Sequence, residues 1–188
     1  MDALSCPFCD AADVARVGQW GGQIITAQWQ CRSCGSYFEA IREDFDDPQP
    51  ASIAIDRRVE WIDTDAAGIY HWTSAFRLVE AAEAALHTAL GVEARTFGLT
   101  PRVAVEADFR GPLRFNDAVR VELRVEDVGR SSVRYGFTLR GPEGVACEGR
   151  LTTCLIDPAT RRATAWPPDI ARLLEGGGPQ RPGPGAPA

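Results

Sequence analysis

The sequence predicts an α+β fold, in which one long helix packs into the concave face of a curved antiparallel sheet behind a small cysteine-rich unit. Three observations predict this fold. One period-two segment precedes a helical segment, four more follow it, and two Cys-x-x-Cys pairs occupy the N-terminal region. Period-two alternation indicates half-buried strands, and apolar spacing of three and four residues indicates a helix. Successive strands joined by short turns favour an antiparallel sheet, whose one face the helix can cover.

Length and composition limit the classes of protein that the chain can represent. Its 188 residues are 45% hydrophobic and 24% charged, which is ordinary for one globular domain with a small satellite. The net charge of -6 disfavours nucleic acid as a partner, because binding phosphates requires clustered basic residues. Neither a membrane-spanning run nor a signal-peptide pattern is visible. We therefore expect a cytoplasmic protein that does not bind membranes.

The first unit, residues 1–43, contains four cysteines with the spacing of a metal site: Cys6, Cys9, Cys31 and Cys34. In a reducing compartment this pattern favours metal over disulfides. Four thiolates complete a tetrahedral zinc site and leave no open position for catalysis, so we expect structural zinc. The pattern looks like a zinc ribbon, and its binding partner, for which a protein is one candidate, stays open.

Residues 44–56 are expected to link the ribbon to the first strand of the main domain. The segment combines acidic residues with two prolines, a composition that favours an extended linker. The alternation of Ile53, Ile55, Val59 and Trp61 then predicts a half-buried strand.

The long helix is predicted to follow a loop over residues 63–68. Thr73 or Ser74 is the expected N-cap, and the helix is expected to run about five turns to Gly91. Its apolar face is defined by Phe76, Val79, Ala82, Leu86 and Leu90.

Four further strands and a short helix complete the predicted domain, residues 57–175. The strands are expected at residues 103–109, 119–125, 133–139 and 145–155, separated by glycine-containing turns. Prolines open a helix that runs through Leu174. The Gly- and Pro-rich residues 176–188 are expected to be a disordered tail.

The loop before the long helix carries a family resemblance. Residues 59–71 read Val-Glu-Trp-Ile-Asp-Thr-Asp-Ala-Ala-Gly-Ile-Tyr-His, a strand that ends in Asp-x-Asp-x-x-Gly just ahead of a helix. This stretch resembles the signature of the 4-hydroxybenzoyl-CoA thioesterase family and of the related Tol-Pal-linked acyl-CoA thioesterases. The resemblance extends over residues 57–174 and implies the hotdog fold. It also implies hydrolysis of acyl-CoA, or of acyl carrier protein thioesters.

The resemblance assigns the catalytic aspartate to Asp65 and the oxyanion-binding backbone amide to Trp72. Chemistry supports both assignments. A carboxylate can attack a thioester carbonyl or deprotonate the water that does, and free amides at a helix N-terminus stabilise the charge that develops on oxygen. For Asp63 we expect only an Asx turn and capping.

The resemblance leaves two further candidates for catalysis open. His71 either orients the substrate or water or fills the loop, because the family's pair is displaced by one position here. Glu80 matches an acidic position in the family's helix and is the reserve base, although a solvated helix charge explains it equally well.

Substrate contacts and partners are also implied by the resemblance. Gly68 belongs to the signature loop, and Arg130 and Ser132 lie in a turn whose basic residue touches the nucleotide end of coenzyme A. Hotdog domains pair, so a homodimer or homotetramer is implied. Two alternatives stay open: a non-catalytic acyl-thioester-binding module with a docking ribbon, and a hotdog dehydratase, for which His71 and His87 offer little support.

Overall fold

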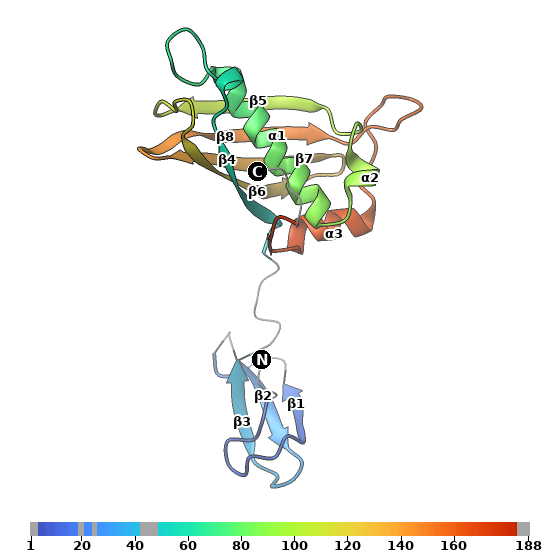
Figure 1. Cartoon of the computed structure of the whole chain (residues 1–188). Helices are drawn as coiled ribbons and strands as arrows, with labels where there is room; N and C mark the ends of the chain where they lie inside the picture. Colours follow the sequence, from blue (N-terminus) through green and yellow to red (C-terminus); the bar gives the residue numbers. More distant parts are fainter. Residues whose placement is uncertain (1–3, 19–20, 24–25, 42–48, 184–188) are drawn as a thin grey trace. The chain divides into compact units, whose positions relative to one another are not determined.

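The structure is a computed structural model that describes residues 4–18, 21–23, 26–41 and 49–183. The chain divides into two compact units, residues 1–47 and residues 48–188 (Figure 1). Each unit has its own sheet. Part of the predicted linker, residues 44–48, lies outside the described residues.

The N-terminal unit is a three-stranded antiparallel sheet of order β1-β2-β3. Its strands are β1 (Val14–Gly18), β2 (Thr26–Cys31) and β3 (Tyr37–Ile41). Among the described residues of this unit, the buried apolar side chains are Cys6, Ala27 and Cys31. Such a small core cannot stabilise a sheet by packing alone, so the unit depends on an additional cross-link, such as disulfides or a bound metal.

The C-terminal unit is built on a six-stranded sheet of order β5-β8-β7-β6-β4-β9. Five strands pair antiparallel with one another: β4 (Ser52–Arg58), β5 (Arg102–Phe109), β6 (Ala118–Val128), β7 (Ser132–Gly141) and β8 (Gly144–Cys154). These strands confirm the predicted pattern of one strand before the long helix and four after it.

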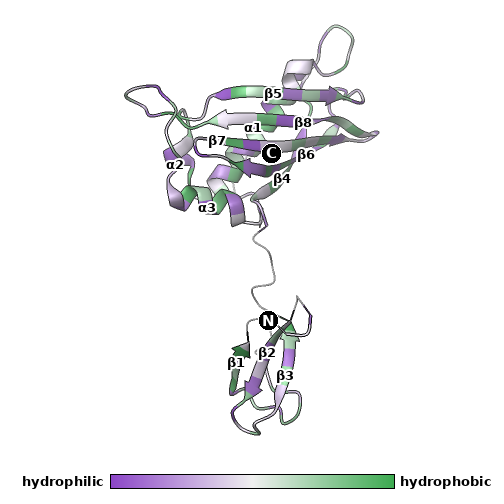
Figure 2. Cartoon of the chain, turned by 180° about the vertical axis from the view of Figure 1, so that it is seen from behind, coloured by the Kyte–Doolittle hydropathy of each residue, from purple (hydrophilic) through white to green (hydrophobic). Residues whose placement is uncertain are grey.

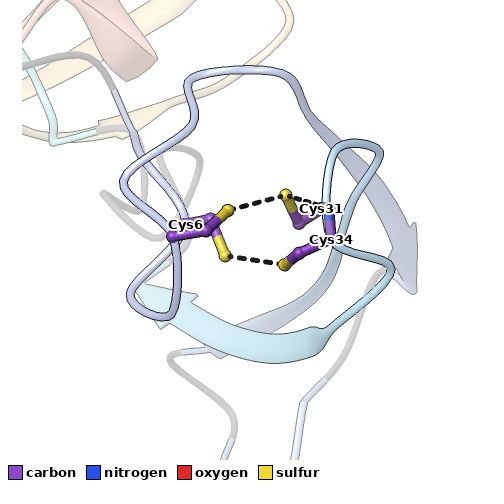
Figure 3. A group of neighbouring side chains, drawn as sticks. Cys6, Cys31 and Cys34 are labelled. Atoms are coloured by element: carbon purple, nitrogen blue, oxygen red, sulfur yellow. Dashed lines mark hydrogen bonds between the residues drawn. The ribbon is translucent and has the colours of Figure 1, made fainter.

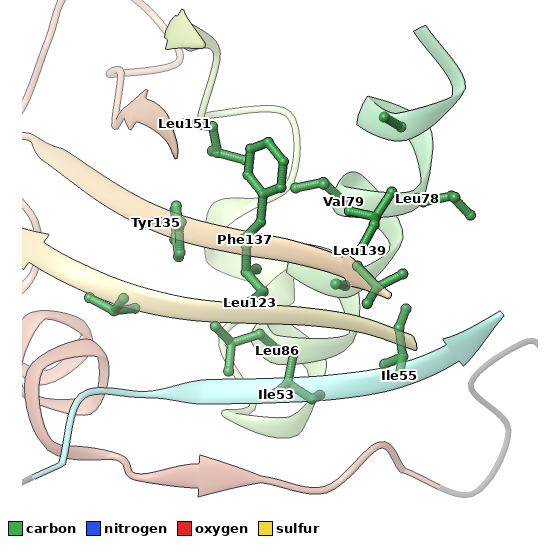
Figure 4. Packing of buried hydrophobic residues seen from close by; sticks show 14 of the residues in the cluster. Ile53, Ile55, Leu78, Val79, Leu86, Leu123, Tyr135, Phe137, Leu139 and Leu151 are labelled. Carbon is green, nitrogen blue, oxygen red and sulfur yellow. The ribbon is translucent and has the colours of Figure 1, made fainter. Parts of the chain in front are cut away.

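The long helix α1 (Trp72–Ala89) lies in the curve of this sheet (Figure 1). Its 18 residues make five turns, and its buried face includes Leu78, Val79, Ala82 and Leu86. Facing side chains of the sheet include Ile53, Ile55, Leu123, Tyr135, Phe137 and Leu139 (Figure 4). The predicted curved sheet around a central helix is therefore confirmed.

The opposite face of the sheet is polar where the strands alternate. On β6, the buried Val121 and Leu123 alternate with Arg120, Glu122 and Arg124 on the other face. Viewed from behind, hydrophilic and hydrophobic residues alternate along the strands (Figure 2). One face of the sheet thus meets the helix and the other meets solvent, as period two requires.

The segment before α1 differs from the prediction. The strand ends at Arg58, and Trp61 lies in a 3-10 turn, η1 (Trp61–Asp63), with 76% of its surface exposed. The reason is a capping box, in which the side chains of Glu60 and Asp63 each accept a hydrogen bond from the other residue's backbone amide. This reciprocal cap favours a turn over continued strand.

The C-terminal segment also differs from the prediction. A four-residue helix, α2 (Glu93–Thr96), follows α1, and α3 (Pro168–Gly176) begins with proline as expected. Beyond α3, β9 (Pro179–Gln180) pairs parallel with β4, where the sequence predicted a disordered tail. The Gln180 side-chain amide donates to the Gly177 carbonyl at 2.6 Å, which fixes this short strand. Among the described helices, none is long and apolar enough to cross a membrane.

Candidate active site

Asp65 lies in a tight loop between η1 and α1. A bridge between Thr64 and Tyr70 closes the loop at its base. The Ala67 amide donates to Asp65 Oδ1 at 2.8 Å, which forms an Asx turn. The residue is exposed, and Oδ2 has no hydrogen bond to any residue that the structure describes. The carboxylate is therefore oriented through one oxygen while the other is open to solvent.

Gly68 gives this loop its shape. Its φ of +75° lies in the left-handed region, and its amide donates to the Asp65 carbonyl at 3.0 Å. A side chain here would meet open space, but the backbone conformation would be strained. Gly68 thus positions Asp65 through the turn.

Asp63, two residues earlier, belongs to the capping box of the 3-10 turn, whereas the Asx turn expected of it is made by Asp65. Its side chain is 2% exposed, and it accepts from Arg77 Nε at 3.0 Å and from the Glu60 amide at 2.8 Å. Its carbonyl accepts from the His71 amide and from the Ser74 hydroxyl. Asp63 therefore joins the 3-10 turn to the start of α1.

The start of α1 is capped by His71, whereas Thr73 or Ser74 was predicted. His71 Nδ1 accepts from the Thr73 amide at 3.3 Å and lies 2.6 Å from the Thr73 hydroxyl. The ring nitrogen can serve as the cap because His71 has extended backbone dihedrals directly before the helix. Trp72 is the first helical residue, where a backbone amide has no intrahelical acceptor. Its side chain is 58% exposed.

Tyr70 fixes the Asp65 loop to one end of the sheet. Its amide donates to the Leu113 carbonyl at 2.7 Å, and its hydroxyl donates to the Ala146 carbonyl at 3.2 Å. Burial raises the pKa of Tyr70 to about 12, so the hydroxyl remains a donor. The Tyr70 ring lies 6.2 Å from Phe109, the last residue of β5. The loop therefore lies beside the C-terminal end of β5.

Aromatic side chains surround this end of the helix. The Trp72 and Phe76 rings meet edge to face at 6.0 Å, and Phe109 is 46% exposed. The loop, the first turn of α1 and the end of β5 thus combine an open carboxylate with exposed apolar surface. This combination suits an apolar ester or thioester.

The other predicted site residues are not gathered here within one chain. Arg130 and Ser132 lie at the β6–β7 turn, where the Arg130 carbonyl accepts from the Trp166 amide and the Ser131 carbonyl accepts from the Leu155 amide. Leu155 follows β8, whereas Ala146 is near its start, so roughly 30 Å of strand separates the turn from the Asp65 loop. Glu80 lies two turns into α1 and is 3.4 Å from Arg102.

Sequence reasoning missed a buried polar cluster in the second half of α1. Glu83 and His87 are 3% and 1% exposed on the face that packs against the sheet. His87 Nδ1 lies 2.8 Å from the Thr96 hydroxyl, and His87 Nε2 lies 3.0 Å from the Tyr135 hydroxyl. Glu83 is hydrogen-bonded to Arg102. The available signal was the spacing: Glu83 and His87 are four residues apart and lie on the same face of the helix as Val79 and Leu86.

The four cysteines of the N-terminal unit form the predicted cluster (Figure 3). All four sulfurs lie within 4.8 Å of one another; Cys6 and Cys34 Sγ are 3.7 Å apart, and Cys9 and Cys31 Sγ are 3.6 Å apart. Four zinc–sulfur bonds of about 2.3 Å in a tetrahedron require sulfurs about 3.8 Å apart, so the spacing fits zinc. Backbone amides of Phe8 and Cys34 approach Cys6 and Cys31 Sγ, respectively.

Comparisons with known proteins agree with this geometry. Residues 59–174 match the family described as the thioesterase-like superfamily, and residues 1–42 match the PaaD zinc beta ribbon domain. The chain is 35% identical over 134 residues to a 1,4-dihydroxy-2-naphthoyl-CoA hydrolase of Prochlorococcus marinus (strain MIT 9303), covering 65% of this chain and 89% of the relative.

Solved structures share the fold of the C-terminal unit. A 1,4-dihydroxy-2-naphthoyl-CoA thioesterase from Synechocystis is similar with a TM-score of 0.59 and 16% identity, covering 65% of this chain and 95% of the other. A hypothetical protein, TT1821, from Thermus thermophilus is similar with a TM-score of 0.58 and 26% identity, covering 65% and 95%. The predicted hotdog fold is thereby confirmed.

Proposed function

Because the chain belongs to the thioesterase-like superfamily, we propose that it hydrolyses acyl-CoA thioesters with Asp65 as the catalytic carboxylate. The observation that carries this role is an exposed carboxylate with one oriented and one open oxygen, in the loop that leads into α1. The Asp65 carboxylate either deprotonates a water that attacks the thioester carbonyl, or attacks it directly to form a mixed anhydride that water then hydrolyses. In both routes the carbon–sulfur bond breaks, and a proton from the water passes to the leaving thiolate.

Stabilisation of the transition state is assigned to the first turn of α1. The Trp72 amide carries a partial positive charge that the helix dipole reinforces, and it suits the oxygen on which negative charge develops. His71, in the cap, orients this turn. Release of the thiol and of the acid then returns Asp65 to its ionised form.

The proposed substrate is a coenzyme A thioester of an aromatic acyl group. Related proteins are named for 1,4-dihydroxy-2-naphthoyl-CoA, and exposed rings of Trp72 and Phe109 border the Asp65 loop. An acyl carrier protein thioester carries the same reacting group. Competition between the two carriers in hydrolysis assays distinguishes them.

The proposed functional form is a homodimer joined at β5. Among the described strands, only β8 pairs with β5, so the other edge of β5 presents unpaired backbone groups. Val103 and Val105 on this strand are 61% and 48% exposed. Antiparallel pairing with a second copy would bring the Arg130 end of one chain toward the Asp65 end of the other, which supports Arg130 and Ser132 as coenzyme A contacts.

The ribbon is proposed to hold structural zinc. Its four sulfurs have the spacing of a closed tetrahedral site, and a closed site leaves no position for substrate. Reduced thiolates and a coenzyme A substrate both agree with a cytoplasmic location. Docking of a partner protein is the proposed role of the ribbon's exposed side chains, including Phe8 and Tyr37.

Thiol release from a panel of acyl-CoAs tests the enzymatic proposal. We expect turnover by the wild type and a loss of at least about 100-fold in kcat for Asp65→Asn, because removing a catalytic acid or base has effects of this size. Asp127→Asn, which changes another exposed carboxylate on β6, is the matched control and should retain activity. Recovery of intact acyl-CoA bound to the wild type would instead identify a binding module.

Metal analysis of the full chain tests the ribbon. We expect about one zinc per chain, and loss of zinc in Cys31→Ser with the rate of thiol release unchanged. An equal loss of thiol release on removal of zinc would contradict the structural role.

A further inference from the structure

A pocket lies beside the middle of α1, away from the Asp65 loop. It has a volume of about 420 Å³, and its lining includes Glu83 of α1, Phe97, Thr100 and Arg102 at the start of β5, and Arg161. Glu80 also lines it. Glu80, the reserve base, is the one predicted site residue in this lining, and the proposed function of Asp65 does not use the pocket.

Glu83, which lines the pocket, has one oxygen that lacks a hydrogen-bond partner. The Glu83 side chain is 4% exposed; one of its oxygens binds Arg102, whereas Oε1 has no hydrogen bond to any described residue. Leaving such a group unpaired is costly, so a ligand that binds it gains free energy.

The unpaired oxygen selects the kind of ligand. Carboxylate Oε1 accepts a hydrogen bond, so it suits a hydroxyl group, which can donate one. The two glutamates offset the charges of Arg102 and Arg161, which disfavours a phosphate. His87 and Tyr135 already bind each other and are committed to the core. Phe97, stacked on His87 with ring centroids 6.3 Å apart, offers a flat apolar wall.

Within one chain, the pocket is too far from Asp65 to receive the acyl group. Glu83 is eleven residues beyond Trp72, which corresponds to about 16 Å along the helix, longer than an aromatic acyl group. In a dimer with full-length antiparallel pairing of β5, Arg102 of one chain faces Phe109 of the second copy across about 5 Å. Phe109 contacts Tyr70, so the Asp65 loop of one chain then borders the Glu83 pocket of the other.

We propose that the Glu83 pocket is a specificity subsite for a hydroxyl group on the acyl part of the thioester, held at Asp65 of the second copy. Glu83 Oε1 accepts the hydrogen bond from that hydroxyl, and Arg102 fixes the carboxylate. This inference rests on the proposed function and on pairing of two copies through β5. Glu83 is thus a specificity-determining residue that does not take part in the hydrolytic step.

Matched substrates test the recognition. The kcat/KM for 4-hydroxy-2-naphthoyl-CoA relative to 2-naphthoyl-CoA should fall at least about tenfold in Glu83→Leu, because a charge-assisted hydrogen bond is lost. Glu83→Gln, a change of similar volume, should lower the ratio by roughly threefold, because a neutral amide oxygen accepts a weaker hydrogen bond than a carboxylate, and it serves if Glu83→Leu does not fold. Glu143→Leu, an exposed control, should keep the wild-type ratio. An unchanged ratio in both pocket variants overturns the inference.

Mixed dimers test whether the pocket serves the other chain. Co-refolded Asp65→Asn and Glu83→Leu chains form hybrids with one intact composite site, so hydrolysis of the hydroxylated substrate should reach roughly a quarter of the wild-type rate. If Glu83 served Asp65 of its own chain, the mixture would not exceed the activity of its Glu83→Leu fraction. A wild type that hydrolyses neither substrate refutes the proposed function, whereas a wild type that hydrolyses both without complementation refutes only the subsite.

Discussion

The two ends of α1 hold their polar groups in opposite ways. At the N-terminal end, Asp65 is exposed in a turn and has one oxygen without a partner, which suits a group that must meet a reacting bond. In the C-terminal half, Glu83 and His87 are almost fully buried among fixed partners. Exposure keeps a carboxylate ionised and accessible, whereas burial fixes geometry and moves pKa values. One helix therefore offers reactivity at one end and recognition at the other.

Burial shifts the two acid–base groups of the C-terminal half toward their neutral forms. Desolvation raises the pKa of Glu83 to about 7, although the nearby Arg102 opposes this shift. Desolvation lowers the pKa of His87 to about 4, and the charge of Arg102 lowers it further. Asp63 shows that the N-terminal end contains a buried carboxylate too, which makes the pair Asp63 and Asp65 the sharpest internal test of the comparison.

The largest expected effect on stability is that of Asp63→Ala. This change removes hydrogen bonds from Arg77 and from the Glu60 amide, so the free energy of unfolding should fall by about 3 kcal/mol. Arg77 is 50% exposed and can be solvated, which keeps the loss below that of an unpaired buried charge. Asp65→Ala should cost less than about 1 kcal/mol, since only one turn hydrogen bond is lost. Urea titrations measure both; equal losses would remove the distinction between the two carboxylates.

A smaller effect is expected from the titration of His87. Its folded-state pKa is lowered to about 4, so its contribution to stability is complete above the unfolded value near 6.5 and is lost as pH falls toward 4. By pH 5 the loss should be about 2 kcal/mol. His87→Gln lacks this titration while keeping hydrogen-bonding capacity toward Thr96 and Tyr135. Between pH 8 and pH 5, the free energy of unfolding of the wild type should therefore fall by about 2 kcal/mol more than that of the variant. If the difference between the two proteins stays constant with pH, His87 is not buried in its neutral form.

The two ends of α1 differ in how well they could be predicted, because one depends on a local sequence pattern and the other on contacts between distant residues. The Asp65 loop is local: an Asp-x-Asp-x-x-Gly stretch between a strand and a helix is readable from contiguous residues. The helix, the strands and the cysteine cluster are likewise set by periodicity and spacing. The cap at His71 was missed because the turn around Asp63 selects it through tertiary hydrogen bonds.

The Glu83 cluster could not be predicted with the same ease because its partners are distant in sequence. Arg102 and Tyr135 lie 19 and 48 residues from their partners Glu83 and His87, respectively. Only the sheet register brings these partners together, so the helical pattern showed two polar residues on an apolar face without saying what would satisfy them.

The smallest expected effect concerns Glu80, the reserve base, which lies on α1 between the exposed Asp65 loop and the buried Glu83. Its side chain is 59% exposed, and among the described residues its ion-pair partner is Arg102, at 3.4 Å. Exposed pairs contribute little, so Glu80→Gln should change the free energy of unfolding by less than about 0.5 kcal/mol.

If Asp65 is the catalytic carboxylate, kcat should also stay within about threefold of the wild type, because Glu80 then makes no contact with the reacting bond. Steady-state thiol release checks this, with Asp65→Asn measured alongside. A loss of kcat in Glu80→Gln comparable to that in Asp65→Asn would move the base from the exposed loop to the helix, because a carboxylate two turns into α1 would then be performing the chemistry.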